Sequence, residues 1–125
     1  MKISVLVPVF NEENTVIQIL EKVNKQNNLN FSLEIIVIDD GSTDRSRDLL
    51  SNRNDLYTHF IELGKNLGKG GAIKEGLKIA TGNYILFQDA DLEYEPNDYS
   101  KIFYAIEHFD AEVVIGSRNL SPQYV

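Results

Sequence analysis

The chain has 125 residues, enough for a single domain with its own core, and its 42% hydrophobic and 25% charged content is typical of a globular protein. It has no cysteine and two histidines, which excludes disulfide bonds and thiolate chemistry and argues against a structural zinc site. Its 12 basic and 19 acidic residues give a net charge of −7, which repels phosphate backbones, so we expect no nucleic-acid partner.

The first predicted element is a strand over Ile3–Val9, a near-continuous apolar run that is typical of a strand buried on both faces. With its neighbour Phe10 the run is too short to span a membrane, and it lacks the cleavage site of a signal peptide. No other run is long enough, so we expect a cytoplasmic segment. Asn11 is expected to cap a following helix, with Glu12 and Glu13 in its first turn. The apolar stripe of that helix is Val16, Ile17, Leu20 and Val23.

Two more strands follow, over Leu33–Ile38 and Tyr57–Leu63. His59 lies within the second of them and is expected to be structural. Between the two strands lies a turn over Gly41–Asp44, in which Ser42 is expected to cap the second helix. A glycine-rich loop over Gly64–Gly71 should then lead into a third helix that ends at Gly82.

The carboxyl-terminal part contains a predicted fourth strand over Tyr84–Phe87 and an acidic loop over Gln88–Glu95. Pro96 suits the first turn of a fourth helix, and a fifth strand is expected over Glu112–Ile115. Strands that alternate with helices predict an α/β fold with a mostly parallel sheet flanked by helices. One sequence does not determine the order of the strands, and 3-2-1-4 is the usual order in doubly wound sheets. Ligands in such sheets bind at the carboxyl ends of the strands, where the unusual polar residues of this chain occur.

Asp89 and Asp91 give the strongest chemical signal. Residues two apart in an extended segment point to the same side, so both carboxylates can face one point. Carboxylates that lie so close repel one another unless a cation intervenes, and Mg²⁺ or Mn²⁺ is commonly held by one or two carboxylates together with substrate phosphates. The alternative interpretation is a solvated acidic loop before a helix.

Three further residues are candidate ligands of a nucleotide. Asp40, at the end of a strand, can accept hydrogen bonds from a base or ribose. Lys69, in the glycine-rich loop, can present a cation to an anion, and Arg118 can hold phosphate oxygens. Taken singly, each has a plain structural alternative: an ordinary turn, close backbone packing with a solvated lysine, and a surface arginine.

These motifs occur together and in a fixed order, as VPVFNEE, IIVIDDGSTD, NLGKGGAIKEG, GNYILFQDADLEYEP and VIGSR. The series resembles family 2 glycosyltransferases of the GT-A fold, a Rossmann-like nucleotide-binding fold. The elements NLGKGGA and GSR are most similar to the branch that transfers sugars to polyprenyl phosphates. The resemblance covers almost the whole chain, from Ile3 to Arg118.

The resemblance implies a role for each matching position. It places the base and ribose of the nucleotide at Pro8, Val9, Glu12 and Asp40. It places the metal and the donor diphosphate at Asp89 and Asp91, with Glu93 as a further ligand where the branch often has glutamine. It also implies a phosphate contact and a catalytic role for Arg118, a catalytic role for Asp91 and a donor contact for Lys69.

The activity that the resemblance implies is inverting transfer of a hexose from a GDP- or UDP-hexose, with Mg²⁺ or Mn²⁺, to an acceptor such as a polyprenyl phosphate. Family members run well past the length of this chain. We therefore expect residues 1–125 to be one donor-binding domain, cut before its acceptor-binding part, and the whole protein to act at the cytoplasmic face of a membrane. A sheet edge or apolar face left by truncation would favour homo-oligomers.

Other classes of protein remain as alternatives. A sugar nucleotidyltransferase shares the sheet type but needs a glycine-rich basic loop after the first strand, where this chain has Phe10 to Glu13. A phospho-aspartyl enzyme or receiver domain matches the aspartate positions poorly. A non-catalytic interaction module would bind a protein partner and would need neither nucleotide nor metal.

Overall fold

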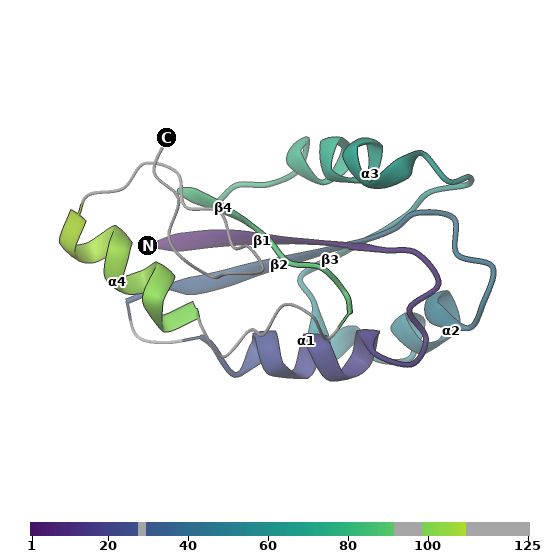
Figure 1. The fold of residues 1–125 in the computed structure, drawn as a ribbon, viewed down its shortest axis with the longest axis horizontal. Helices are drawn as coiled ribbons and strands as arrows, with labels where there is room; N and C mark the ends of the chain where they lie inside the picture. Colours follow the sequence, from purple (N-terminus) through teal and green to yellow (C-terminus); the bar gives the residue numbers. More distant parts are fainter. Residues whose placement is uncertain (28–29, 92–98, 110–125) are drawn as a thin grey trace.

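The computed structural model describes residues 1–27, 30–91 and 99–109, and they form a parallel sheet with helices on both faces (Figure 1). The order of the strands is β3-β2-β1-β4, and every neighbouring pair is parallel. The expected α/β fold with a 3-2-1-4 sheet is therefore confirmed, whereas the expected fifth strand falls outside the described residues. The strands are β1 (Lys2–Val9), β2 (Ser32–Asp39), β3 (His59–Glu62) and β4 (Tyr84–Phe87).

Within the described residues, four helices and one 3-10 turn connect or follow the strands. The helix α3 lies alone on one face of the sheet, and the other three helices lie on the opposite face (Figure 1). The helices are α1 (Val16–Asn24), α2 (Ser46–Ser51), α3 (Gly68–Leu77) and α4 (Tyr99–Phe109), and the 3-10 turn is Asn54–Leu56. In the described part of the chain, no helix is long and apolar enough to cross a membrane.

The central strands β1 and β2 are buried on both faces, as their apolar runs predict. Alternate residues of β1, such as Val5 and Val7, join the larger core with Leu20 of α1. On the other face, Leu6 packs in a smaller cluster with Ala72 of α3. Because successive side chains of a strand point to opposite faces, these two strands support both layers and fix the ends from which the functional loops leave.

The helix boundaries differ from the sequence-based expectation. The first helix begins at Val16, so Asn11 does not cap it, and Glu12 and Glu13 lie in the preceding loop. The second begins at Ser46, and Ser42 does not cap it, because the Ser42 hydroxyl accepts a hydrogen bond from the backbone of Asn11 at 3.0 Å. In both loops these polar side chains form hydrogen bonds to the other loop and do not cap the helix that follows.

The glycine-rich segment also folds differently from the expectation. The third helix already begins at Gly68, within the segment predicted as a loop, and ends at Leu77, five residues before the predicted cap Gly82. Gly82 instead lies against β1, where a Cβ atom would come within 2.6 Å of the backbone nitrogen and hydroxyl oxygen of Ser4. Close approach of two backbones, rather than the end of a helix, is therefore what requires glycine there.

Candidate functional site

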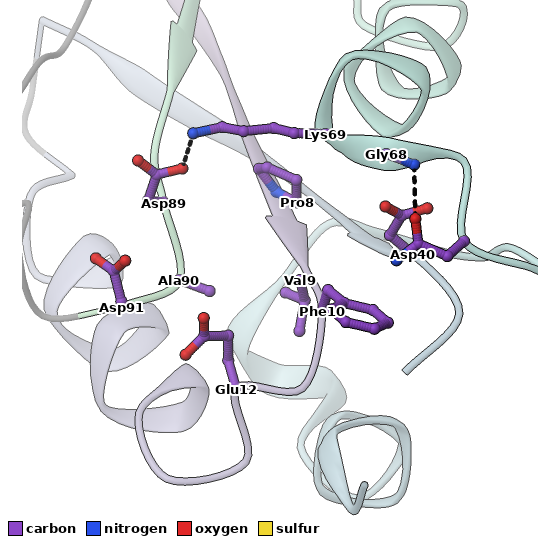
Figure 2. Close-up of a pocket in the computed structure, with 11 residues that line it drawn as sticks. Pro8, Val9, Phe10, Glu12, Asp40, Gly68, Lys69, Asp89, Ala90 and Asp91 are labelled. Atoms are coloured by element: carbon purple, nitrogen blue, oxygen red, sulfur yellow. Dashed lines mark hydrogen bonds and ion pairs between the residues drawn. The ribbon is translucent and has the colours of Figure 1, made fainter. Parts of the chain in front are cut away.

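A pocket of about 320 Å³ opens at the carboxyl ends of β1, β2 and β4, beside the amino-terminal turn of α3 (Figure 2). Its volume is near the lower end of the roughly 300 to 1,000 Å³ usual for small-molecule sites. It lies where the strand order reverses about β1, which is where ligands bind in open α/β sheets. It is lined by Pro8, Val9, Phe10, Glu12, Asp40, Asn66, Gly68, Lys69, Asp89, Ala90 and Asp91.

All the candidate site residues that the structure describes line this one pocket, although they come from four separate segments. The sequence analysis selected Pro8, Val9, Glu12, Asp40, Lys69, Asp89 and Asp91, and each of them is part of the lining. The other two candidates, Glu93 and Arg118, lie outside the described residues. The pocket also includes Phe10, which the sequence analysis did not select, and which is 44% exposed.

Carboxylates dominate the charge of the pocket. Burial raises the pKa of Glu12 above its ordinary value of 4.5, and the hydrogen bond from Thr15 opposes that rise. The negative charges of Asp91, Asp44 and Asp89 raise the pKa of Glu12 further. Burial, and to a lesser extent the neighbouring negative charges, therefore disfavour ionisation of Glu12, and a cation bound among these carboxylates would offset their repulsion.

Lys69 reaches from the first turn of α3 to Asp89, and its ammonium forms an ion pair with one carboxylate oxygen (Figure 2). The lysine side chain is 61% exposed and that of the aspartate 20% exposed. Among the described residues of the pocket, Lys69 is the one basic side chain. The glycine-rich segment thus supplies a positive charge to the acidic end of the pocket.

Asp40 anchors the other side of the pocket. Its side chain is buried, and its Oδ1 atom accepts a 2.7 Å hydrogen bond from the backbone nitrogen of Leu67. The backbone before it is equally fixed, since the Asp40 nitrogen donates to the carbonyl of Val9 at 2.8 Å. The turn after it requires Gly41, which has a φ of 74° and lies so close to Lys65 and Asn66 that a Cβ atom would collide.

Two residues that sequence reasoning missed hold the Asp89–Asp91 segment in place. Gln88 is buried, accepts a 2.7 Å hydrogen bond from the hydroxyl of Tyr99 in α4, and donates to the Asp89 carbonyl at 3.0 Å. On the other side, the Thr15 hydroxyl donates to the Ala90 carbonyl at 2.8 Å. Neither residue carries a local sequence signal for this role, because the bonds to Tyr99 and Ala90 join residues 11 and 75 positions apart.

A latch of hydrogen bonds joins the loop after β1 to the loop after β2, and Asn11 is its centre. The Asn11 side-chain oxygen accepts hydrogen bonds from the backbone nitrogens of Thr43 and Asp44, at 2.8 and 3.2 Å. The backbone of Glu12 donates in return to the hydroxyl of Ser46 at 2.9 Å. Asn11 has a φ of 52°, a conformation that asparagine tolerates better than most residues. The latch therefore fixes Glu12 relative to the Asp40 side of the pocket.

Substitution of Asn11 should separate the effect of these hydrogen bonds from that of backbone strain. We expect Asn11→Gly to lose about 1 kcal/mol of unfolding free energy through the lost hydrogen bonds, which are exposed. Asn11→Ala should lose about 1 kcal/mol more, because alanine resists the positive φ. Urea denaturation of both variants measures the difference, and a glycine variant as stable as the parent would show that the side-chain hydrogen bonds of Asn11 contribute nothing to stability.

The donor set suits a divalent cation that arrives with a diphosphate. Asp89 and Asp91 could provide two hard oxygen ligands, and Glu12 adds a third carboxylate to the pocket. Within the described ranges, no three acidic or histidine side chains are placed to hold an ion by themselves. Mg²⁺ and Mn²⁺ sites built from one or two carboxylates are completed by substrate phosphates, so the residues fit such an ion better than a preformed protein cage.

The sequence is similar to that of known proteins over nearly its whole length. The model of the family described as Glycosyl transferase family 2 matches residues 4–123. A dolichyl-phosphate beta-glucosyltransferase from Dictyostelium discoideum is 36% identical over 131 residues, a match that covers 94% of this chain and 40% of that protein. The chain thus spans less than half the length of this relative.

Two solved structures share the fold. TarS 1-349 of S. aureus in complex with UDP-GlcNAc has a TM-score of 0.75 and 27% sequence identity, over 89% of this chain and 32% of that chain. Mannosyltransferase PcManGT from Pyrobaculum calidifontis, in complex with GDP-Man and Mn²⁺, has a TM-score of 0.62 and 30% identity, over 71% of this chain and 27% of that chain. In both comparisons the present chain corresponds to about a third of the longer protein or less.

Proposed function

The chain belongs to glycosyl transferase family 2 and has the GT-A fold, and from this premise we propose that it forms the donor-binding part of a hexosyltransferase. The donor would be a nucleoside diphosphate hexose. The observation that carries the proposal is the pocket at the carboxyl ends of the strands, where separate segments of the described chain bring together four carboxylates and one lysine. This pocket has one end suited to a nucleoside and one suited to a metal diphosphate.

The nucleoside end is formed by residues at the ends of β1 and β2. Asp40 provides a buried carboxylate whose Oδ1 is already engaged by the backbone of Leu67, and which can accept from a base or ribose through its other oxygen. The exposed ring of Phe10 offers an apolar face beside it. Pro8 and Val9, the last two residues of β1, also line the pocket.

The diphosphate end is formed by Asp89, Asp91 and Lys69. We propose that Asp89 and Asp91 hold Mg²⁺ or Mn²⁺, with Glu93 as a further ligand, and that Arg118 contacts phosphate. Bound there, the ion would neutralise charge on the leaving diphosphate. We propose a catalytic role for Asp91 and for Arg118, the latter outside the described residues. The likeness to PcManGT, a protein solved with GDP-Man and Mn²⁺, supports a divalent ion.

For the whole protein, we propose inverting transfer to a polyprenyl phosphate at the cytoplasmic face of a membrane. The support is the likeness to a relative named as a dolichyl-phosphate glucosyltransferase. In this proposal the present chain supplies the donor side of the reaction.

Calorimetric titration with UDP and GDP tests the proposed donor site. We expect one of the two nucleotides to bind in the presence of Mn²⁺ with a Kd in the micromolar range and to lose at least about tenfold in affinity when EDTA removes the ion. Adenosine diphosphate serves as the control for selectivity. If a folded chain binds neither UDP nor GDP, and a longer version of the protein binds neither as well, the donor-site proposal is wrong.

A further inference from the structure

We propose that the Lys69 ammonium stays paired with the Asp89 carboxylate until a metal ion and a diphosphate bind together. The ammonium then exchanges the carboxylate for the diphosphate as its partner. The inference rests on the proposed function, and it makes Lys69 the residue that couples the binding of the metal ion to the binding of the nucleotide. The ion pair between Lys69 and Asp89 carries it, because the carboxylate oxygen that the ammonium contacts is on a residue proposed to bind the metal.

The geometry gives Lys69 two sets of partners within one pocket. Its backbone is fixed as the second residue of α3, which packs on the sheet through Ala72. Its side chain crosses the carboxyl end of β1 to reach Asp89 on the far side of the pocket (Figure 2). With 61% of the side chain exposed, the ammonium can leave the carboxylate without moving the helix. A diphosphate in the same pocket lies within the range of that side chain.

The charges of the pocket explain why the transfer needs both ligands. Without a diphosphate, a divalent ion at Asp89 would lie close to the ammonium that is paired with the same carboxylate, and the two positive charges would repel each other. Displacing the lysine into water also breaks its ion pair with no compensating partner. When a diphosphate is present as well, the Lys69 ammonium would pair with its negative oxygens, and the Asp89 carboxylate would then be available to hold the ion.

This arrangement makes metal and nucleotide bind cooperatively. Lys69 weakens the binding of the ion alone and strengthens the binding of the nucleotide in the presence of the ion. Because linkage is reciprocal, the nucleotide must tighten the ion by the same factor by which the ion tightens the nucleotide. Loss of the lysine charge should therefore change the two affinities in opposite directions, which loss of an ordinary diphosphate contact would not do.

The experiment compares the parent chain with Lys69→Gln, Lys69→Arg and Lys74→Gln. The last variant is a matched control, because Lys74 lies on the same helix, is exposed and is not part of the pocket. Binding of Mn²⁺ is measured from the electron paramagnetic resonance signal of the free ion, first without nucleotide and then with UDP or GDP. Nucleotide affinity is measured by calorimetry at saturating Mn²⁺, and thermal denaturation verifies that each variant is folded.

We expect Lys69→Gln to bind Mn²⁺ alone about fivefold more tightly and to bind the nucleotide with Mn²⁺ about fivefold more weakly. Each change corresponds to the loss of one partly exposed ion pair, with Asp89 in the free chain and with the diphosphate in the complex. Lys69→Arg should keep the parent's cooperativity, and Lys74→Gln should match the parent in both measurements. If Lys69→Gln leaves the affinity for Mn²⁺ alone unchanged or lowers it, the proposed exchange is wrong even if nucleotide binding falls.

These outcomes are separable from a failure of the proposed function. If the parent chain and its longer form bind no nucleotide with Mn²⁺, the donor site itself is wrong, and the exchange fails with it. If the parent binds nucleotide in a metal-dependent way while Lys69→Gln weakens both ligands, the donor site stands and Lys69 is a simple diphosphate contact.

Discussion

Replacement of Asp91 by asparagine is expected to abolish the metal-dependent part of nucleotide binding while leaving the chain folded. Asp91 lies in the pocket beside Asp89 and Glu12, and its charge is felt at Glu12. An amide keeps the shape of the side chain but removes the negative charge that a hard divalent ion requires. We expect the affinity for nucleotide in Mn²⁺ to fall by about 100-fold, to the level that the parent chain shows in EDTA.

The same substitution should lower the pKa of Glu12. Burial is the main reason that the pKa of Glu12 is raised, and the charge of Asp91 adds to it, so removing that charge should bring the pKa back toward 4.5. Carboxyl-carbon NMR titration of the parent and the variant, without metal, measures the shift. Together with calorimetry it tests whether Asp91 acts through charge at the place where the structure puts it.

Asp48→Asn is the matched control, because Asp48 is an exposed aspartate of α2 outside the pocket. It should leave both nucleotide binding and the pKa of Glu12 unchanged. If Asp91→Asn binds nucleotide with Mn²⁺ as tightly as the parent does, Asp91 is not a metal ligand, and the proposed diphosphate end must be reassigned.

Replacement of Glu34 by glutamine is expected to destabilise the chain strongly at neutral pH, although Glu34 lies far from the pocket. Glu34 is in β2, at the end of the sheet away from the pocket, and its side chain is only 8% exposed. Its carboxylate accepts hydrogen bonds from the hydroxyl of Ser4 at 2.6 Å and from the backbone and hydroxyl of Thr81 at 2.9 and 2.7 Å. A glutamine cannot accept all of these bonds, since one of its terminal atoms is a donor.

The pKa of Glu34 states how strongly the fold prefers the charged form. Burial by itself raises that pKa, but the hydrogen bonds from Ser4 and Thr81 and the charge of Lys2 outweigh burial and lower it from 4.5 to about 2. A shift of this size corresponds to about 3 kcal/mol of unfolding free energy at neutral pH. This is a large part of the 5 to 15 kcal/mol, roughly, that stabilises a domain.

The sign of the pH dependence follows from the lowered pKa. The stabilisation is fully present above the unfolded value of 4.5 and is lost as the pH falls toward about 2, where the folded chain also binds the proton. Urea denaturation should therefore show a gap of about 3 kcal/mol between the parent and Glu34→Gln at pH 7, which narrows progressively between pH 4.5 and pH 2. Exposed Glu107, changed to glutamine, is the control and should give no such gap. A gap that stays constant with pH would mean that packing, rather than charge, explains the loss.

The network around Glu34 illustrates what sequence could not reveal. Glu34 and Thr81 are 47 residues apart in the sequence. Glu34 directly precedes a continuous apolar run, which shows no alternation that would predict a role for a charged side chain. His59 also borders this network, since its Nε2 atom lies 3.7 Å from the Glu34 carboxylate. Only the pairing of β2 with its neighbours brings these groups together.

The errors in the helix caps have the same origin. Asparagine and serine before a helical pattern favour a cap when only local hydrogen bonds are considered. In the folded chain, Asn11 and Ser42 bind each other's loops instead, across 31 residues of sequence. A contact between two loops satisfies the same polar groups and also fixes the pocket, so the tertiary structure overrides the local preference.

The sequence by itself determined the α/β class and the family. Apolar runs separated by helical patterns leave few topologies for a parallel sheet, of which the order 3-2-1-4 is the usual one. The structure shows that this chain adopts that order. The sequence also pointed to residues of the pocket. Glu12, Asp40, Asp89 and Asp91 follow the ends of parallel strands, which share an edge of the sheet, whereas Pro8 and Val9 were selected through the family resemblance. The tertiary structure alone decided how these residues pair: Lys69 with Asp89, Asp40 with the backbone of Leu67, and Thr15 with Ala90. These pairs join segments 20 to 75 residues apart, and their geometry depends on the packing of helices against the sheet, for which no local pattern exists.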